Sequence, residues 1–416
     1  MALDITSARP DPALLDLPWS VPLEDWPDEH LGALPRGISR HIVRFVKVNS
    51  KVIAVKEIKT DLAVREYNML RFLKKIGQPC VQPFGVVSGR TTADGEELDA
   101  CLLTRHLHFS LPYRALFSQS LRPDTAQRLI DALAVLLVRL HLAGFWWGDV
   151  SLSNTLFRRD AGAYAAYLVD AETGEIHSTL SNGQREHDLD IARVNIAGEL
   201  MDLAAGGLLA LNVDPIKISQ TIVDRYRSLW RELTARERFE QGCRWRVDDR
   251  IRRLNELGFD VDELTVSTDF SGATIHIQPK VVDAGHHSRR LLRLTGLDVE
   301  ENQARRLLND LDAFRASQDR QNDDEPLVAH DWLSQVYEPV TRTVPRDLTK
   351  KLEPAEVFHE ILEHRWYLSE DAGHDIPLKE VIADYIKYVL PGKPDEDAVL
   401  GIDTVRASVA ISAKSQ

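Results

Sequence analysis

Cysteine is scarce in this 416-residue sequence, and the three that occur are far apart. Cys80, Cys101 and Cys243 have neither the paired spacing of a zinc ribbon nor the even number that a disulfide framework needs. We therefore expect no disulfide scaffold and no cysteine-bound zinc. A reducing, cytoplasmic setting suits such cysteine usage.

Long apolar runs and an excess of basic charge are also lacking. The most apolar helical stretch, residues 129–142, contains Asp131 and Arg139 and is too short to span a bilayer. The first residues show neither the basic nor the apolar region of a signal peptide. Acidic residues number 64 against 51 basic ones, a formal net charge of −13. The sequence therefore predicts no transmembrane segment and no nucleic-acid partner.

What is present is an ordinary globular composition, with 44% hydrophobic and 28% charged residues, long enough for about two or three domains. Residues 1–30 are rich in proline, aspartate and leucine. They predict a poorly structured lead-in segment that docks on the body of the protein through Trp19 and Trp26.

Residues 31–110 predict a small, sheet-rich lobe. Two β-rich runs flank Asn49 and Ser50, a pair typical of a hairpin turn. Apolar residues at helical spacing predict a helix over 61–75, and two more strands follow at 81–87 and 100–104.

Residues 111–214 predict a helical lobe, with helices over 123–142 and 188–205 and short strands between them. Residues 215–416 predict a mostly helical C-terminal domain, interrupted by a hairpin over 264–282 centred on Ser271 and Gly272; the last residues, 407–416, are expected to fray. The fold class is therefore α+β, with a bilobal core followed by a further domain.

Two histidine-containing segments of the C-terminal domain have residue types that occur in binding sites. His359 and His364 are five residues apart and align poorly on one helical face, so no zinc site is predicted. Two histidines and three arginines within 286–293 form a basic cluster. That cluster suits either a solvated helix start or the binding of an acidic group such as a phosphate.

The segment 141–157 carries the residues most suggestive of chemistry. Asp149 and Asn154 are separated by four residues on a loop between a predicted helix and a predicted strand. Phosphoryl transfer needs a carboxylate that takes the proton of the attacking hydroxyl and an oxygen ligand for magnesium. These two residues can face one site in those roles. His141, eight residues before Asp149, is expected to tether the loop.

Four further residues fit the same chemistry. Asp170 ends an apolar strand 16 residues after Asn154, where a second metal ligand is expected, and Glu172 would assist at the metal. Lys56 lies on a predicted strand and suits pairing with phosphates, and Glu66 on the next helix would hold it by an ion pair. This order of residue types is that of the kinase signature set.

On these motifs the first half of the chain resembles the protein-kinase-like fold in its atypical, small-molecule branch. It is similar to the bacterial lipopolysaccharide core (Kdo or heptose) kinases and to the aminoglycoside and choline kinases. On the Leu-Thr-Gly-Leu stretch at 294–297 and on residues 301–310, the whole chain resembles an uncharacterised actinobacterial family. That family carries a C-terminal domain of unknown function after the kinase-like part.

The resemblance implies a role for each of five positions, with ATP and Mg²⁺ as cofactors. Asp149 matches the catalytic base, Asn154 and Asp170 the metal ligands, Lys56 the phosphate-binding lysine and Glu66 its partner.

The sequence departs from the family pattern in two places. No Gly-x-Gly-x-x-Gly loop precedes the lysine, so we expect the backbone around Gly37, Ser39 and Arg40 to cover the phosphates instead. Asp170 is followed by Ala171 and Glu172 rather than by Phe-Gly, which favours a small-molecule or sugar acceptor over a protein.

Three hypotheses follow. The first is a phosphotransferase that moves the γ-phosphoryl group of ATP to a hydroxyl of a sugar or another small molecule, with a C-terminal domain that completes the acceptor site or recruits a protein partner. The second is a nucleotide-binding pseudokinase with a regulatory or scaffold role. The third retains the fold but transfers a nucleotidyl group. The intact Asp149 favours the first.

Overall fold

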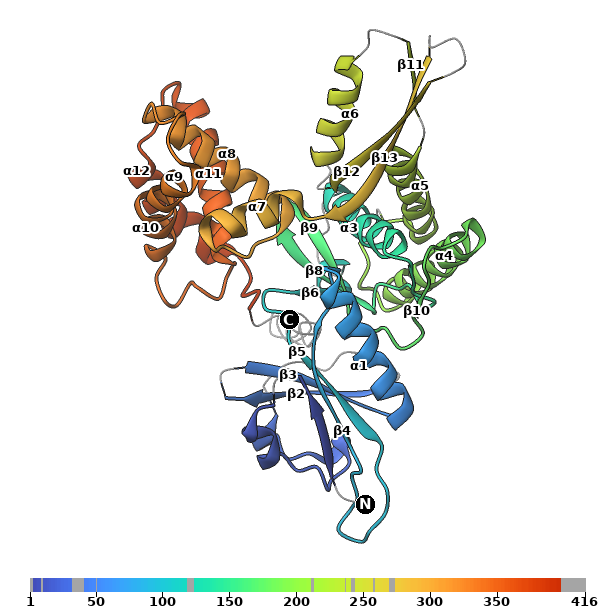
Figure 1. Ribbon diagram of the computed structural model, residues 1–416. Coiled ribbons are helices and arrows are strands. Elements are labelled where there is room, and N and C mark those ends of the chain that lie inside the picture. The colour runs from blue at the N-terminus through green and yellow to red at the C-terminus, as the bar shows by residue number, and fades with distance from the viewer. Residues whose placement is uncertain are drawn as a thin grey trace. The chain divides into compact units, whose positions relative to one another are not determined.

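The computed structural model describes residues 3–8, 10–31, 41–49, 51–117, 123–210, 213–235, 237–240, 244–256, 259–268 and 274–397. The chain divides into two compact units, whose elements are labelled in Figure 1. The first unit comprises residues 1–158, 166–223 and 397–416, and the second comprises residues 159–165 and 224–396.

The first lobe of the first unit is built on a five-stranded antiparallel sheet in the order β1-β4-β5-β3-β2. Helix α1 (Thr60–Lys75) follows β3 and packs on β4 and β5, as Figure 1 shows. The strands are β1 (Asp4–Ser7), β2 (Ile42–Val48), β3 (Lys51–Ile58), β4 (Gln82–Ser88) and β5 (Ala100–Arg105).

Both faces of this sheet are apolar, and each needs a cover. Side chains alternate along a strand, so Ala100 and Leu102 face α1, whereas Cys101 and Leu103 belong to a separate buried cluster. Two leucines and two tryptophans of the lead-in segment complete that second cluster: Leu14, Leu23, Trp19 and Trp26.

The lead-in segment is therefore regular, and the expectation of a poorly structured start is wrong. Strand β1 pairs with β4, and three 3₁₀ helices follow over Pro12–Asp16, Leu23–Asp25 and Asp28–His30. Docking through Trp19 and Trp26 is observed, with the two rings edge to face at 5.1 Å. The apolar second face of the sheet supplies the partner that the isolated segment lacks.

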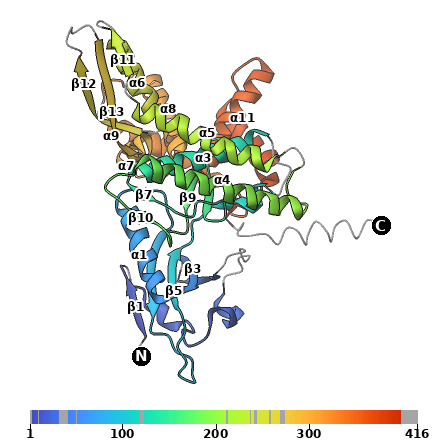
Figure 2. The same cartoon turned by 90° about the vertical axis from the view of Figure 1, so that its right-hand side faces the viewer.

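The second lobe of the first unit is mainly helical. Helix α4 begins six residues before its predicted start at Asp188, because Ser181 and Gln184 form a capping box ahead of it. Figure 2 shows α3 and α4 together, away from β1. The elements are β6 (Leu111–Pro112), α2 (Tyr113–Phe117), α3 (Pro123–Leu142), β7 (Phe145–Trp146), β8 (Thr155–Asp160), β9 (Ala163–Leu168), β10 (Glu175–Ile176) and α4 (Asn182–Ala205).

Two small sheets position the loops of this lobe. Strands β6, β8 and β9 form one, in the order β6-β8-β9, and β7 pairs with β10 in the other. The hairpin β8–β9 thus begins directly after Asn154 and ends two residues before Asp170.

Helix α5 (Pro215–Thr234) contains the boundary between the units, at residues 223 and 224. In the second unit, β11 (Glu237–Glu240), β12 (Phe259–Thr268) and β13 (Thr274–Ala284) form an antiparallel sheet in the order β11-β13-β12, with α6 (Arg244–Glu256) against β12. The hairpin is longer than predicted, and its turn at Ser271 and Gly272 lies outside the described residues.

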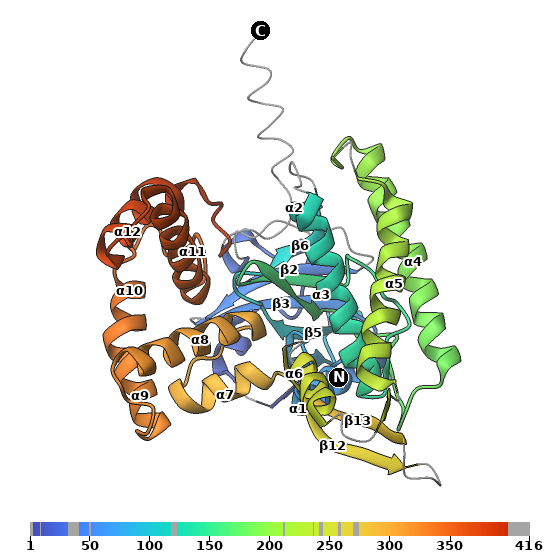
Figure 3. The same cartoon turned by 90° about the horizontal axis from the view of Figure 1, so that it is seen from above.

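Six helices then surround one apolar core that includes Trp332, Tyr337 and Phe358. Figure 3 shows these helices as a cluster. They are α7 (His286–Thr295), α8 (Glu301–Ser317), α9 (Glu325–Trp332), α10 (Glu338–Arg342), α11 (Pro354–Ala372) and α12 (Leu378–Asp384), with π-helical turns at Leu333–Tyr337 and Tyr385–Val389 and a 3₁₀ turn at Leu390–Gly392.

The α+β fold class is confirmed, with a sheet-rich lobe, a helical lobe and a separate C-terminal domain. No helix among the described residues has both the length and the hydrophobicity to cross a membrane. Cys80 and Cys101 are buried and free, and the predicted frayed end, 407–416, lies outside the described residues.

Candidate active site

Lys56 lies at the centre of a cluster of carboxylates in the first unit. Its Nζ is 2.6 Å from Asp170 Oδ2, 3.0 Å from Glu66 Oε2 and 3.4 Å from Glu172 Oε2. Strand β3 carries the lysine, α1 carries Glu66, and the turn after β9 carries the other two acids. The structure thus brings together four of the predicted site residues from three separate elements.

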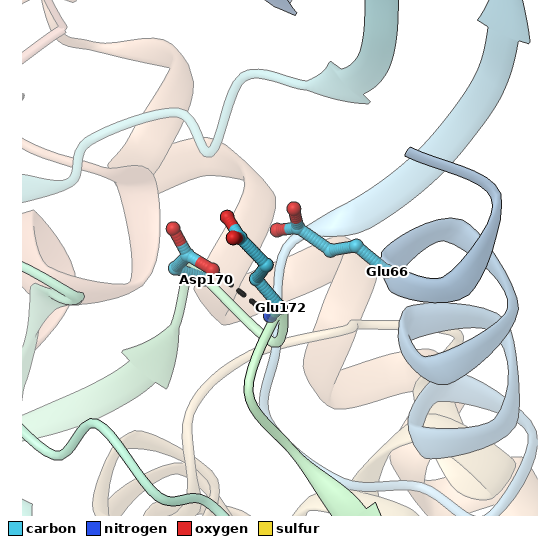
Figure 4. A group of neighbouring side chains, drawn as sticks. All are labelled: Glu66, Asp170 and Glu172. Atoms are coloured by element: carbon cyan, nitrogen blue, oxygen red, sulfur yellow. Dashed lines mark hydrogen bonds between the residues drawn. The ribbon is translucent and has the colours of Figure 1, made fainter. Parts of the chain in front are cut away.

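The acids of this cluster are also held by the backbone. Glu66 is 1% exposed, and its Oε1 accepts a hydrogen bond from the Ala171 amide at 3.3 Å. The Glu172 amide donates to Asp170 Oδ1 at 2.9 Å. Figure 4 shows this bond, with Glu66 reaching from α1 toward the other two carboxylates. The cluster is therefore anchored by main-chain as well as side-chain contacts.

Negative charge is in excess here. Burial by itself lowers the pKa of Lys56, but the attraction of Glu66 and Asp170 outweighs burial and leaves that pKa above its ordinary value. Burial, and then repulsion from Asp170, raise the pKa of Glu66 to about 7 despite the nearby ammonium. The neighbouring acids thus raise the pKa of the lysine, whereas burial first and then repulsion between the acids raise the pKa of Glu66.

This excess of charge suits a divalent cation. Oxygen atoms of Glu66, Asp170 and Glu172 all lie within 4.8 Å of one another. Carboxylate oxygens are the side-chain ligands that magnesium prefers. The residues present therefore fit the cation that the sequence predicts, and Glu66 belongs to the group. The predicted ligand Asn154 lies on another loop, and its backbone carbonyl accepts from the amide of Val169.

The predicted catalytic loop is fixed around Asp149. The Asn154 side-chain amide donates to Asp149 Oδ2 at 3.1 Å, and Asn195 of α4 donates to Asp149 Oδ1 at 3.2 Å. Both carboxylate oxygens thus have a donor. The Asn154 carbonyl accepts from the amide of Val169, the residue before Asp170, at 3.0 Å. This bond joins the loop to the strand that ends in the carboxylate cluster.

A second link joins the two segments. The Trp147 indole nitrogen donates to the Asp170 carbonyl at 2.8 Å, and the Thr173 hydroxyl donates to the Trp147 carbonyl at 2.7 Å. These three hydrogen bonds join the Asp149 loop to the Asp170 turn.

Besides Asn195, two acids of α4 that the sequence did not predict as site residues accept hydrogen bonds from backbone amides of this loop. Asp188, fully buried, accepts from the amides of Trp147 and Gly148, each at 2.8 Å, and its Oδ2 lies 3.1 Å from His141 Nε2. The expected tethering role of His141 thus runs through Asp188. Glu199 accepts from the amides of Leu152 at 2.7 Å and Ser153 at 2.9 Å.

A sequence pattern could have revealed these residues. Asp188, Asn195 and Glu199 are spaced by seven and four residues, so they share one face of a helix. The helix predicted over 188–205 already contains all three residues, so this shared face could be read from the sequence.

Gly37, Ser39 and Arg40, expected to cover the phosphates, lie outside the described residues. Their predicted role stays a prediction.

Comparisons with known proteins match two parts of the chain. Residues 44–196 match the lipopolysaccharide kinase (Kdo/WaaP) family, and residues 228–390 match a domain of unknown function, DUF4032. The predicted resemblance is confirmed for both parts of the chain, and the family match supports a kinase-like phosphotransferase.

A solved structure, WaaP in complex with acyl carrier protein, matches with 16% sequence identity and a TM-score of 0.35. The match covers 62% of this chain and 99% of that chain. No curated protein matches the sequence.

Proposed function

We propose that the protein is an ATP- and Mg²⁺-dependent phosphotransferase that moves the γ-phosphoryl group to a hydroxyl of a sugar or another small molecule. The observation that carries the proposal is the Lys56 cluster, in which the ammonium is held between Glu66 and Asp170 and tied to the Asp149 loop. The family match over residues 44–196 supports the same class of reaction.

Lys56 would bind phosphate oxygens of the nucleotide, and Glu66 would hold its ammonium in place. Asn154, Asp170 and Glu172 would hold magnesium, which when bound neutralises charge on the phosphates. The amide nitrogen of Asn154 is used by Asp149, so its oxygen is the atom that would face the cation.

Asp149 would take the proton of the acceptor hydroxyl. In the transfer, a bond forms between the acceptor oxygen and the γ-phosphorus, the bond from that phosphorus to the β,γ-bridging oxygen breaks, and ADP leaves. The hydrogen bonds from Asn154 and Asn195 orient both oxygens of the carboxylate for this role. Orientation of this kind lowers the barrier because little rearrangement remains at the moment of reaction.

Three further features belong to the proposal. The acceptor is a small molecule, because the residues after Asp170 depart from the protein-kinase pattern. The domain at 228–390 completes the acceptor site or recruits a protein partner. The setting is cytoplasmic, supported by the free, buried thiols of Cys80 and Cys101.

The test is a thermal-shift titration with ATP, with and without magnesium. A ligand that binds only the native state stabilises it by about 2.7 kcal/mol at 100 times its Kd. We expect a magnesium-dependent shift for the wild type that Asp170→Ala abolishes. Asp190→Ala is the matched control, since that side chain is 73% exposed on α4. Asp149→Ala should bind magnesium–ATP and form no ADP with any acceptor.

The outcomes separate the three hypotheses. Absence of any shift for the wild type at millimolar ATP would exclude the phosphotransferase. Binding without transfer to any of a panel of sugar and small-molecule acceptors indicates a pseudokinase. A product heavier by a nucleoside monophosphate identifies nucleotidyl transfer.

A further inference from the structure

The β8–β9 hairpin connects two predicted metal ligands and is shared between the two units. Strand β8 starts at the residue after Asn154, and β9 ends two residues before Asp170. The strands belong at their base to the first unit, but the tip, residues 159–165, belongs to the second. What holds the tip is therefore part of the second unit.

The tip is held through its backbone and through one buried acid. Asp160 accepts from the Gln303 amide at 2.8 Å and from the Asn302 side chain at 2.9 Å. The Ala161 amide donates to Glu356 Oε2 at 2.9 Å. We call Asn302 and Gln303, on α8, and Glu356, on α11, the hairpin clasp.

Gln303 is the central member of the hairpin clasp. Its side-chain nitrogen donates to the Arg159 carbonyl at 3.1 Å and to Glu356 Oε2 at 3.0 Å. Its side-chain oxygen accepts from the Glu300 amide at 3.2 Å. The residue is 1% exposed, so these groups have no water to replace a lost partner.

The turn at the hairpin tip has one defined backbone conformation. Ala161 and Gly162 have φ angles of 49° and 83°, so both central residues of the turn are in the left-handed region. Such values give the two-residue hairpin turn whose twist matches that of the strands. Alanine adopts this region at a cost. The bond from its amide to Glu356 stabilises that conformation.

Hydrogen bonds also hold the base of the hairpin. The Thr155 hydroxyl donates to the Ser151 carbonyl at 2.8 Å, and Val169 pairs with Asn154. Paired strands resist bending, so a hairpin of this length transmits the position of its tip to its base over roughly 20 Å.

We propose that Gln303 and Glu356 are positioning residues for phosphoryl transfer: by fixing the hairpin tip they set the relative position of Asn154 and Asp170. The inference rests on the proposed function. It assigns the domain of unknown function a part in the reaction without contact with the reacting atoms, much as partners outside the ligand shell orient metal ligands.

The test uses the full-length chain and two variants of the hairpin clasp. Gln303→Met removes the bonds of the side chain and keeps its length. Glu356→Gln removes a buried charge, and Glu363→Gln makes the same change at an exposed position of α11. The half-saturating Mg²⁺ concentration is measured for ATP binding and for turnover, together with hydrogen exchange of the peptide 155–168.

We expect Gln303→Met to raise the half-saturating Mg²⁺ concentration about tenfold, the lower end of the range for residues that orient metal ligands. The hairpin peptide should exchange faster. Glu356→Gln should act in the same direction and Glu363→Gln should match the wild type. If the role of these residues is purely structural, their substitution lowers the fraction of active protein, and the half-saturating Mg²⁺ concentration of the remaining active protein stays unchanged.

Two results would overturn the inference. One is faster hairpin exchange in folded variants with unchanged Mg²⁺ dependence. The other is a Mg²⁺ defect that appears only in variants whose global melting temperature has collapsed. If the wild type itself binds no magnesium–ATP, the proposed function fails and the positioning role with it, while hydrogen exchange still shows whether the clasp holds the hairpin.

Discussion

Asp188 offers the sharpest test of how the candidate site is built. Its two oxygens serve three donors: Oδ2 accepts from Trp147 and faces His141, and Oδ1 accepts from Gly148. In Asp188→Asn one of these oxygens becomes an NH₂ group. In either orientation of the amide, the backbone N–H of Trp147 or of Gly148 then faces the NH₂ group, which is another donor.

The size of the effect follows from burial. Leaving one buried donor without an acceptor costs about 1–3 kcal/mol, and Asp188→Ala, which strands all three donors, should cost about 3 kcal/mol or more. Each 1.4 kcal/mol is about a factor of ten in an equilibrium constant. The Trp147 and Gly148 amides should therefore exchange roughly tenfold faster or more in Asp188→Asn.

Hydrogen exchange of the segment 141–154, with a urea titration for global stability, is the measurement. Asp190→Asn is the matched control on the same helix and should stay within about 0.5 kcal/mol of the wild type. Unchanged exchange at Trp147 and Gly148 in Asp188→Asn would refute the account, because the loop would then be held by something other than this carboxylate.

The remaining predictions concern a buried arginine, the raised pKa of Glu66 and a glycine with positive φ. Arg90→Met should lower the free energy of unfolding by about 3–5 kcal/mol in a urea titration. It removes a fully buried cation that binds Glu57 Oε1 at 2.5 Å and two backbone carbonyls of the lead-in segment. A loss under 1 kcal/mol, roughly the contribution of an exposed ion pair, would contradict this prediction. The raised pKa of Glu66, about 7, means that the native state keeps a proton that the unfolded chain releases near its ordinary value. Stability should therefore fall as pH rises from about 4.5 to 7, and Glu66→Gln should flatten this slope in urea titrations at several pH values, whereas an unchanged slope would assign it to other groups. Gly144→Ala should lower the melting temperature far more than Gly77→Ala, since both have positive φ but only at Gly144 does the added Cβ overlap a main-chain oxygen, that of His177; equal losses would show that φ alone matters.

Much of the candidate site could be predicted from the sequence because its residues end or begin local elements. Lys56 lies on one of the two β-rich runs that predict the hairpin, and Glu66 is the seventh residue of the following helix. Asp170 comes two residues after the end of strand β9. Their order along the chain matches that of the kinase signature set. Their catalytic roles stay predictions, but their convergence on one cluster is observed.

Other features depend on contacts between distant segments. Asp188 and Glu199 accept hydrogen bonds from backbone amides 40 or more residues away, and no local pattern predicts which amides a buried acid will contact. The lead-in segment looked irregular because proline-rich stretches lack periodicity. It became ordered through a sheet face that exists only after β3, β4 and β5 have paired.

The sequence by itself determined the α+β class, the two lobes with a further domain, and the residue types of the site, since periodicity, turn residues and charge are local properties. Only the tertiary structure decided that three acids share one lysine, that α4 holds the Asp149 loop, and that the tip of the β8–β9 hairpin belongs to the second unit. The physical reason is that these features are hydrogen bonds and burial between segments far apart in the chain. Which groups meet in these contacts depends on how the elements pack, and a single stretch of sequence does not determine that packing.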